Sequence, residues 1–235
     1  MNRLILEESD FITPERCLIK GRRFRQLVDI IKCPVGKICK AGLLNGKRGT
    51  AEVLEVTDEQ ILFQVSLTEE PPAAVPVRLA IAMQRPQTFS KVLHIATTMG
   101  VKKILFFHSF KVEKSYWQSP RIEPANFRSE LIEALEQSGD TILPEVEFCN
   151  RFKDFIETRL TEFSAGTQII FGDPPAQGDA CQYRNCDVTI VVGPEGGFTE
   201  YETEKLREIG AAGVTLGARI LRTEYALASL LGKLT

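Results

Sequence analysis

The residues best suited to chemistry stand in a glycine-rich stretch, Gly193-Pro194-Glu195-Gly196-Gly197. An apolar run, Val188–Val192, precedes it, and Thr199 with Glu202 three residues later gives the pattern of a helix-capping box. We therefore expect a strand, a sharp loop and a helix that ends at Gly210. Glycines let a backbone approach a ligand closely, and open α/β folds bind nucleotides at the carboxyl ends of their strands.

The composition of this loop limits the kind of ligand that it would hold. A phosphate-binding loop needs bare amides and a following lysine, whereas no lysine follows these glycines and Glu195 stands among them. We expect the loop to repel a pyrophosphate but to accept a neutral adenosine or a cation such as the sulfonium of S-adenosylmethionine (SAM). The alternative is a glycine-rich turn that only packs a helix on a strand.

A second loop, residues 216–224, repeats the pattern of a strand end, a glycine and a helix start. Thr223 is expected to cap the final helix. Two such loops on neighbouring strands would close over one ligand. Leu216, Ile220 and Leu221 would then contact the face of an adenine, while backbone amides bind its edge.

The composition is that of a globular chain without a membrane span. Hydrophobic residues make up 43% of the 235 residues, enough for one large or two modest domains. No apolar run approaches the roughly 20 residues of a membrane helix, and the first residues lack a signal pattern, so we expect a cytoplasmic protein. Six cysteines and two histidines show no spacing typical of a metal site or a Cys/His nucleophile, so we expect reduced thiols and no metal.

The net charge of −2 conceals an uneven distribution of charge. Residues 1–50 contain 11 Lys and Arg against 5 Asp and Glu, whereas the remainder is acidic. We therefore expect the amino-terminal part to bind a polyanion such as RNA, although a basic face that is merely solvated is the alternative. The candidate RNA contacts are Lys20, Arg22, Arg23, Arg25, Lys32, Lys47, Arg48 and Arg85.

Two segments with different sequence patterns flank a proline-rich linker at residues 69–76. Short strands separated by turn residues predict a small β-barrel over residues 1–74, with a hairpin at Asn45-Gly46. Alternating strands and helices over residues 75–235 predict a mostly parallel sheet covered by helices. The expected strands are 38–44, 50–56, 61–65, 77–83, 103–107, 167–171, 188–192 and 214–216, and the expected helices lie within 87–99, 125–138, 152–163, 201–209 and 223–230.

The two glycine loops carry a resemblance to a known superfamily. The sequence GPEGGF at residues 193–198, followed by LGARILRTE at residues 216–224 behind a small basic barrel, resembles the SPOUT methyltransferases. Within that superfamily the chain resembles the RsmE family, which methylates N3 of a uridine in the 16S rRNA of the small ribosomal subunit. Residues 133–139 and 144–146 match as well.

This resemblance implies a fold and a set of ligands. The fold is a PUA-like β-barrel followed by an α/β domain with a mostly parallel sheet and a deep trefoil knot. The ligands are an RNA substrate, a second copy of the chain in a homodimer, and SAM held in a bent shape by three loops. The implied cofactor-binding residues are Phe171, Gly172, Gly193, Pro194, Glu195, Gly196, Gly197, Leu216, Gly217, Ile220, Leu221 and Thr223.

Several positions depart from the family's pattern. Where the family has Glu-Leu-Gly and, after Gln-Ser-Gly, an arginine, this chain has Thr98-Met99-Gly100 and Asp140, and we expect Asp140 to repel a phosphate. The other departures are a missing lysine in Arg85-Pro86-Gln87-Thr88, a missing arginine in Ser109-Phe110-Lys111, and changes at residues 26–32 and Tyr225. The cofactor motifs are thus kept better than those expected to face RNA.

Methyl transfer to uracil N3 needs alignment of the reactants and a way to remove or offset the N3 proton. We expect Arg222 to stabilise negative charge on a uracil oxygen; the alternative is a salt bridge from Arg222 to Glu195 or Glu224. For Glu195 we favour hydrogen bonds to backbone amides that hold the loop over a position facing the sulfonium.

Two other functions remain open at this stage. The departures on the RNA side are also expected of a non-catalytic RNA-binding relative that keeps the cofactor pocket. A conventional doubly wound nucleotide-binding enzyme is the other alternative.

Overall fold

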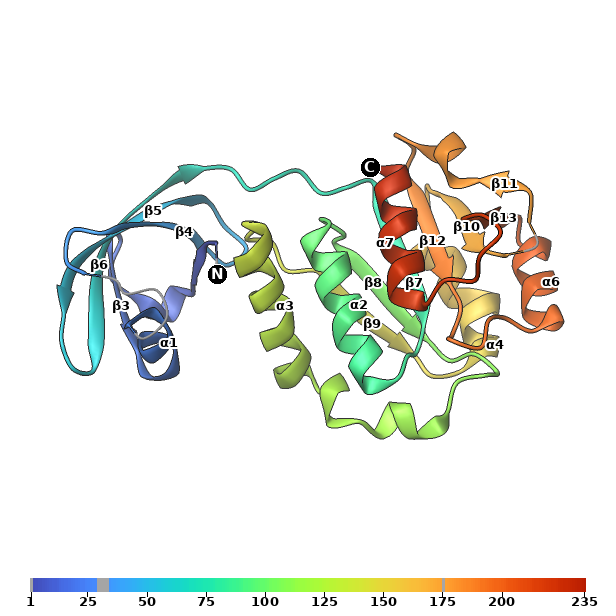
Figure 1. The fold of residues 1–235 in the computed structure, drawn as a ribbon, viewed down its shortest axis with the longest axis horizontal. Helices are drawn as coiled ribbons and strands as arrows, with labels where there is room; N and C mark the ends of the chain where they lie inside the picture. The colour runs from blue at the N-terminus through green and yellow to red at the C-terminus, as the bar shows by residue number, and fades with distance from the viewer. Residues whose placement is uncertain (1, 29–33, 175) are drawn as a thin grey trace. The chain divides into compact units, whose positions relative to one another are not determined.

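The computed structural model describes residues 2–28, 34–174 and 176–235. The chain divides into two compact units, an amino-terminal one of Met1–Pro72 with Leu135–Leu143, and a carboxyl-terminal one of Ala73–Ala134 with Pro144–Thr235 (Figure 1). The composition instead predicts residues 135–143 to lie in the second segment, because a short returning stretch leaves no signal in composition. That residues 1–74 and 75–235 are separate functional domains stays a prediction.

The amino-terminal unit is built on a six-stranded sheet of order β1-β4-β5-β6-β3-β2. Pairing is antiparallel except between β1 and β4, which run parallel. The sheet curls around a core that includes Leu6, Cys17, Ala41 and Phe63, all fully buried. The strands are β1 (Leu4–Leu6), β2 (Phe11–Thr13), β3 (Arg16–Lys20), β4 (Ile38–Leu43), β5 (Arg48–Val56) and β6 (Gln60–Glu69), and the helix is α1 (Gly21–Gln26).

The local sequence explains the central part of this sheet. Alternating burial along β5 follows its alternating apolar and polar residues. Asn45 begins the tight turn before β5 with a φ of 60°, a left-handed conformation that asparagine tolerates. The predicted hairpin and barrel-like sheet are confirmed, whereas the three-residue strands β1 and β2 were not expected because they are too short to show a period.

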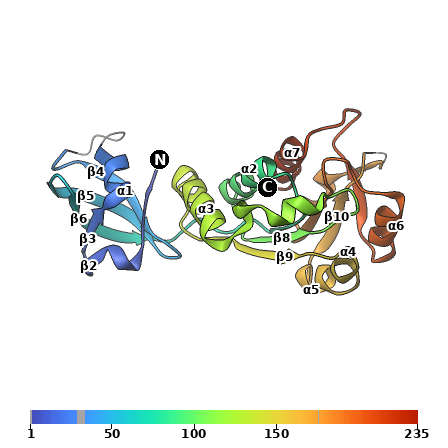
Figure 2. The same ribbon diagram turned by 90° about the horizontal axis from the view of Figure 1, so that it is seen from below.

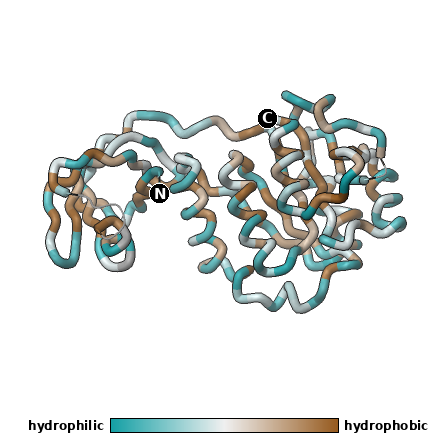
Figure 3. The backbone as a smooth tube through the Cα atoms, viewed as in Figure 1, coloured by the Kyte–Doolittle hydropathy of each residue, from teal (hydrophilic) through white to brown (hydrophobic). Residues whose placement is uncertain are grey.

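The carboxyl-terminal unit has a seven-stranded, wholly parallel sheet of order β11-β13-β10-β12-β7-β8-β9. Every residue of β12 and all but one of β7 are buried, as their continuous apolar runs predict for a sheet covered on both faces, and Figure 3 shows these hydrophobic strands at the centre. The strands are β7 (Val77–Ala82), β8 (Lys103–Phe107), β9 (Glu145–Cys149), β10 (Gln168–Gly172), β11 (Gly178–Asp179), β12 (Val188–Val192) and β13 (Ala212–Thr215).

Helices cover both faces of this sheet. The helices α2 (Pro86–Thr98) and α7 (Thr223–Leu234) lie side by side on one face, and the helical stretch of α4 (Phe152–Asp154), a π-turn (Phe155–Arg159) and α5 (Leu160–Phe163) lies on the other (Figures 1 and 2). The remaining helices are α3 (Pro124–Ser138) and α6 (Glu200–Glu208). No helix of the described ranges is both long and apolar enough to cross a bilayer.

The path of the chain brings three loops to one edge of the sheet. From β12 the chain passes through the glycine loop and α6 to β13, which pairs with the opposite side of β10. It then returns through residues 216–222 to α7, which packs on α2. The ends of β10, β12 and β13 are therefore neighbours, and the knot stays a prediction. The predicted α/β fold class is confirmed.

Candidate functional site

A cavity of about 610 Å³ lies at the carboxyl ends of β10, β12 and β13. Its walls come from the loops that follow these strands and from the helices α6 and α7. A cavity of this volume is within the range of small-molecule sites. The two glycine loops and the loop after β10 thus enclose one common space.

Eleven of the twelve residues predicted to bind the cofactor line this cavity. The exception is Phe171, which is fully buried and whose ring centroid lies 6.3 Å from that of Phe198. That any of these residues contacts SAM stays a prediction. The lining residues among them are Gly172, Gly193, Pro194, Glu195, Gly196, Gly197, Leu216, Gly217, Ile220, Leu221 and Thr223.

Two of these glycines, Gly217 and Gly193, stand where a side chain would meet different constraints. Gly217 has a φ of 109°, a conformation that other residues adopt only with strain. A Cβ on Gly193 would come within 3.2 Å of the Phe198 ring. Larger residues at either position would therefore disturb the cavity wall.

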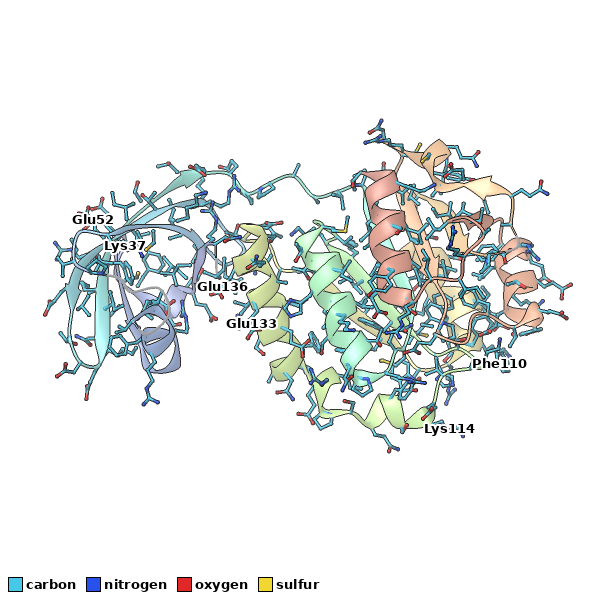
Figure 4. The ribbon with its side chains drawn as sticks, viewed as in Figure 1. Lys37, Glu52, Phe110, Lys114, Glu133 and Glu136 are labelled. Atoms are coloured by element: carbon cyan, nitrogen blue, oxygen red, sulfur yellow. The ribbon has the colours of Figure 1, made fainter. Side chains whose placement is uncertain are left out.

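The buried carboxylate of Glu202 fixes the end of the first glycine loop. Its Oε2 accepts the backbone N–H of Thr199 at 2.8 Å, while the Thr199 hydroxyl accepts the N–H of Glu202, so the predicted capping box is confirmed. Its Oε1 accepts the Ser109 hydroxyl at 2.7 Å and the N–H of Phe110 at 3.0 Å. Phe110, labelled in Figure 4, lies on the connection after β8, so one carboxylate joins two loops.

Lys111 makes a second connection between these loops. Its ammonium donates to the carbonyl of Gly196 at 2.9 Å and to that of Phe198 at 3.3 Å. The lysine that replaces the family's arginine here therefore supports the cavity wall from outside. Sequence reasoning missed this role because nothing in the local pattern links residue 111 to residue 196.

The connection from β7 to α2 is also attached to the first glycine loop. The Gln84 side-chain amide donates to the carbonyls of Ala82 at 2.8 Å and Gly193 at 3.2 Å. The Arg85 N–H donates to Glu195 Oε1 at 3.3 Å. Glu195 therefore accepts a backbone amide hydrogen bond, the arrangement favoured from the sequence, although the amide belongs to a different loop.

Asp173 and Arg207 form an ion pair in the cavity wall that sequence reasoning did not find. Arg207 Nη2 lies 2.7 Å from Asp173 Oδ2, and the Asp173 side chain is only 6% exposed. The Arg207 guanidinium also lies over the Phe171 ring, 5.8 Å from its centroid. A carboxylate directly after β10 was the available signal, because strand ends are where such folds place functional residues.

Arg222 lies at the rim of the site, next to residues that line the cavity. It is exposed and is the residue that precedes α7. Thr223 is the first residue of the helix, so its predicted role as the cap is wrong. Glu195 is paired with Arg85 and Glu224 with Lys91 at 3.2 Å, and no ion pair joins Arg222 to either carboxylate within the described ranges. The Glu224 backbone N–H and Lys91 hold the pKa of the Glu224 carboxyl below its usual value.

The predicted RNA contacts fall into several groups. Arg23, Lys47 and Arg48 pair with carboxylates of their own unit, namely Asp10, Glu70 and Glu69. Lys20 and Arg25 are exposed, Arg22 lies in α1, and Lys32 lies outside the described residues. Arg85 belongs to the other unit and is exposed beside Glu195.

Asp140 does not occupy the exposed position expected from the sequence. Its side chain is buried, and its Oδ1 accepts the backbone N–H groups of Thr141 at 2.6 Å and Ile142 at 3.1 Å. An aspartate is suited to such a turn because its carboxylate bonds nearby amides. The expectation that Asp140 repels a phosphate is therefore wrong. Within the described ranges no group of three or more His, Cys, Asp or Glu could hold a metal ion.

Comparison with known proteins shows similarity over nearly the whole chain. Residues 71–235 match the model of a family described as an RNA methyltransferase domain. The chain is 27% identical over 234 residues to ribosomal RNA small subunit methyltransferase E of Treponema pallidum, covering 96% of this chain and 87% of that protein. It is 25% identical over 228 residues to ribosomal RNA small subunit methyltransferase E 1 of Borreliella burgdorferi, covering 96% and 94% of the two chains.

Two solved structures share the fold. Ribosomal RNA small subunit methyltransferase E from Neisseria gonorrhoeae, bound to SAM, superposes with a TM-score of 0.78 at 20% identity and covers 99% of this chain and 95% of that one. A Legionella pneumophila protein in complex with SAM gives a TM-score of 0.79 at 19% identity, covering 99% and 96%.

Proposed function

Because the chain belongs to the RNA methyltransferase family, we propose that it transfers a methyl group from SAM to N3 of a uridine in the 16S rRNA of the small ribosomal subunit. The single observation that carries this proposal is the cavity enclosed by the two glycine loops. The relatives that are similar along nearly the whole chain are named as small-subunit rRNA methyltransferases, which supports the RNA substrate.

The lining of the cavity fits SAM. Leu216, Ile220 and Leu221 offer apolar surface to an adenine, as predicted, and the volume suits a ligand of this size. Acidic and basic side chains, Glu195 and Arg219 among them, suit a ligand that carries both an ammonium and a carboxylate. When bound, SAM supplies an electrophilic methyl group.

The chain's own residues position the reactants and manage the proton. Uracil N3 carries a weakly acidic proton, so a cation near a uracil oxygen promotes its loss. Arg222, exposed at the start of α7, serves this role in our proposal. Water exclusion and alignment come from the loops that Glu202, Lys111 and Gln84 hold in place.

The amino-terminal unit binds the RNA in this proposal. Lys20 and Arg25 are exposed and neutralise phosphates. Lys47 contacts a phosphate when its ion pair with the largely exposed Glu70 opens. Such contacts position the RNA without reading its sequence. Neutralising Lys20 and Arg25 together is expected to weaken RNA binding and to reduce the slope of log affinity against log salt concentration by about two.

A homodimer is the proposed assembly. The family resemblance motivates it, and three large apolar side chains support it: Ile220 is 90% exposed, Tyr225 60% and Leu221 38%. A cluster of this kind at the start of α7 suits contact with a second copy. Analytical ultracentrifugation should give twice the chain mass, and Tyr225→Asp should give single chains.

The experiment that tests the activity uses small ribosomal subunits from cells that lack this protein. Incubation with the purified protein and methyl-labelled SAM should place label in 16S rRNA, and digestion to nucleosides should yield N3-methyluridine. Labelling of another position on uridine, or of another base, would overturn the site of transfer. SAM binding without labelling of subunits or of naked rRNA would favour the non-catalytic relative, for which the missing lysine at residues 85–88 counts.

A further inference from the structure

The backbone at Gln84 and Arg85 is hydrogen-bonded to the wall of the cavity. The Arg85 backbone N–H bonds Glu195 Oε1, and the preceding Gln84, fully buried, bonds the carbonyl of Gly193. Both acceptor residues line the cavity. The position of the Arg85 backbone is therefore fixed relative to the cofactor loop.

The Arg85 side chain is held along one edge. Its Nε donates to the Tyr116 hydroxyl at 3.2 Å and lies 4.0 Å from Glu195 Oε1, and the Tyr116 hydroxyl donates to Glu113 Oε1 at 3.1 Å. Tyr116 belongs to a 3₁₀ turn (Lys114–Gln118) whose first residue is labelled in Figure 4. Tyr116, followed by Glu195 and Glu113, also raises the pKa of the guanidinium, so its charge is secure.

The other edge of the guanidinium is open. The Arg85 side chain is 68% exposed, and neither terminal nitrogen donates a hydrogen bond to any residue of 2–28, 34–174 or 176–235. The planar fork of an arginine suits a ligand that presents carbonyl oxygens. The Arg85 guanidinium is thus held beside Glu195, a residue that lines the cavity, with its two terminal nitrogens able to donate to a ligand.

From this geometry we infer that Arg85 is a second catalytic residue beside Arg222, which binds one of the two carbonyl oxygens that flank N3 of the substrate uracil, rather than a phosphate. This inference rests on the proposed function. In the transfer, the N3 proton leaves to water, the N3 electron pair forms the bond to the methyl carbon, and the carbon–sulfur bond breaks with its electrons remaining on sulfur. Negative charge spreads onto the oxygens flanking N3, where the guanidinium donates.

The neighbours of Arg85 have matching roles. Glu195 and Tyr116, which is itself bonded to Glu113, orient the guanidinium. Gln84 connects the Arg85 backbone to the loop that holds the cofactor. Ordering of the glycine loop would therefore order Arg85 with it. Tyr116 is a positioning residue in this arrangement because it acts through Arg85.

The test compares Arg85→Ala and Arg85→Lys with the wild-type protein on subunits that lack the modification. Arg121→Ala is the matched control, because Arg121 is another partly exposed arginine of this unit whose bonds go to Ser90 and Glu130, away from the cavity. Four quantities are measured: SAM affinity by calorimetry, subunit affinity against salt, single-turnover rate, and the pH dependence of that rate.

The inference predicts a loss of about 10²–10³-fold in the single-turnover rate for Arg85→Ala, with SAM affinity and the salt slope unchanged. The loss should shrink as the pH rises, because hydroxide then removes the N3 proton unaided, and added guanidinium ion should restore part of the rate. Arg85→Lys should lie between Arg85→Ala and the wild type, since it keeps the charge and loses the fork.

Three results would overturn the inference. A salt slope lower by about one with a normal rate at saturation would make Arg85 a phosphate contact. Weaker SAM binding would make it a support of the cofactor loop, and a rate loss equal at every pH would exclude charge stabilisation. A wild-type protein that forms no N3-methyluridine would instead refute the proposed function.

Discussion

Replacing Glu202 by glutamine tests how the first glycine loop is held. The carboxylate is fully buried and accepts hydrogen bonds from the Ser109 hydroxyl, from the Phe110 N–H and from both the N–H and the hydroxyl of Thr199. Glutamine has nearly the same volume but turns one acceptor atom into a donor. Two of the four bonds are then lost, since a donor faces donors.

The size of the effect follows from these contacts. A hydrogen bond to a charged group contributes about 1.5–3 kcal/mol, and the Ser109 hydroxyl is able to rotate and accept from the new amide. We expect the free energy of unfolding to fall by about 3 kcal/mol, which lowers the melting temperature by roughly 6–12 °C in a protein of this size. If the loosened loop frees one residue that SAM must order again, affinity falls roughly five- to thirtyfold.

Urea unfolding and calorimetric titration of SAM measure the two effects. Glu204→Gln is the matched control, because Glu204 is exposed on the same helix and its change should stay within about 0.5 kcal/mol. A Glu202→Gln protein that loses less than about 1 kcal/mol and binds SAM like the wild type would refute the reasoning.

Three further predictions concern single residues. Gly217→Ala places a side chain at a φ of 109°, at a cost of about 1–3 kcal/mol, and should weaken SAM binding at least fivefold by calorimetry, whereas Gly232→Ala within α7 should stabilise the fold. Asp173→Asn removes the partner of the half-exposed Arg207 and should lower the free energy of unfolding by about 1–2 kcal/mol; an unchanged urea midpoint would contradict this. Burial raises the pKa of the Cys17 thiol to about 12 from 9.0. The thiol of the unfolded chain loses its proton first, so the stabilisation by the buried, protonated thiol is complete below pH 9 and declines by up to roughly 1.4 kcal/mol per pH unit between pH 9 and 12. The difference in the free energy of unfolding between the wild type and Cys17→Ala should therefore narrow between pH 9 and 12. A difference that stays constant with pH would contradict the burial of this thiol.

Much of the carboxyl-terminal fold could be predicted because its strands are long apolar runs that end at glycines. The run Val188–Val192 and the capping residues Thr199 and Glu202 fixed the central junction almost residue by residue. β9 and β11 were missed, since β9 is mixed in polarity and β11 has only two residues. The knot came from resemblance, because no periodicity describes how a chain threads.

The candidate site was predictable in its loops but not in its supports. Ten of the lining residues belong to the two local glycine motifs, whereas Gly172 was named from the family resemblance. The contacts of Glu202 with Ser109, of Lys111 with Gly196 and of Arg85 with Glu195 join residues 85 to 110 positions apart, and a single sequence contains no signal for such pairs. Asp140 shows the converse, because a charged residue was read as surface while its carboxylate bonds backbone amides.

The central claim is that the loops after β10, β12 and β13 together bind SAM. Calorimetric titration of the purified protein with SAM, and separately with NAD, tests it most directly. We predict one SAM site per chain, lost when Gly193→Val fills the wall at the Phe198 ring, and no binding of NAD. Binding of NAD in preference to SAM, or SAM binding that survives Gly193→Val unchanged, would contradict the account.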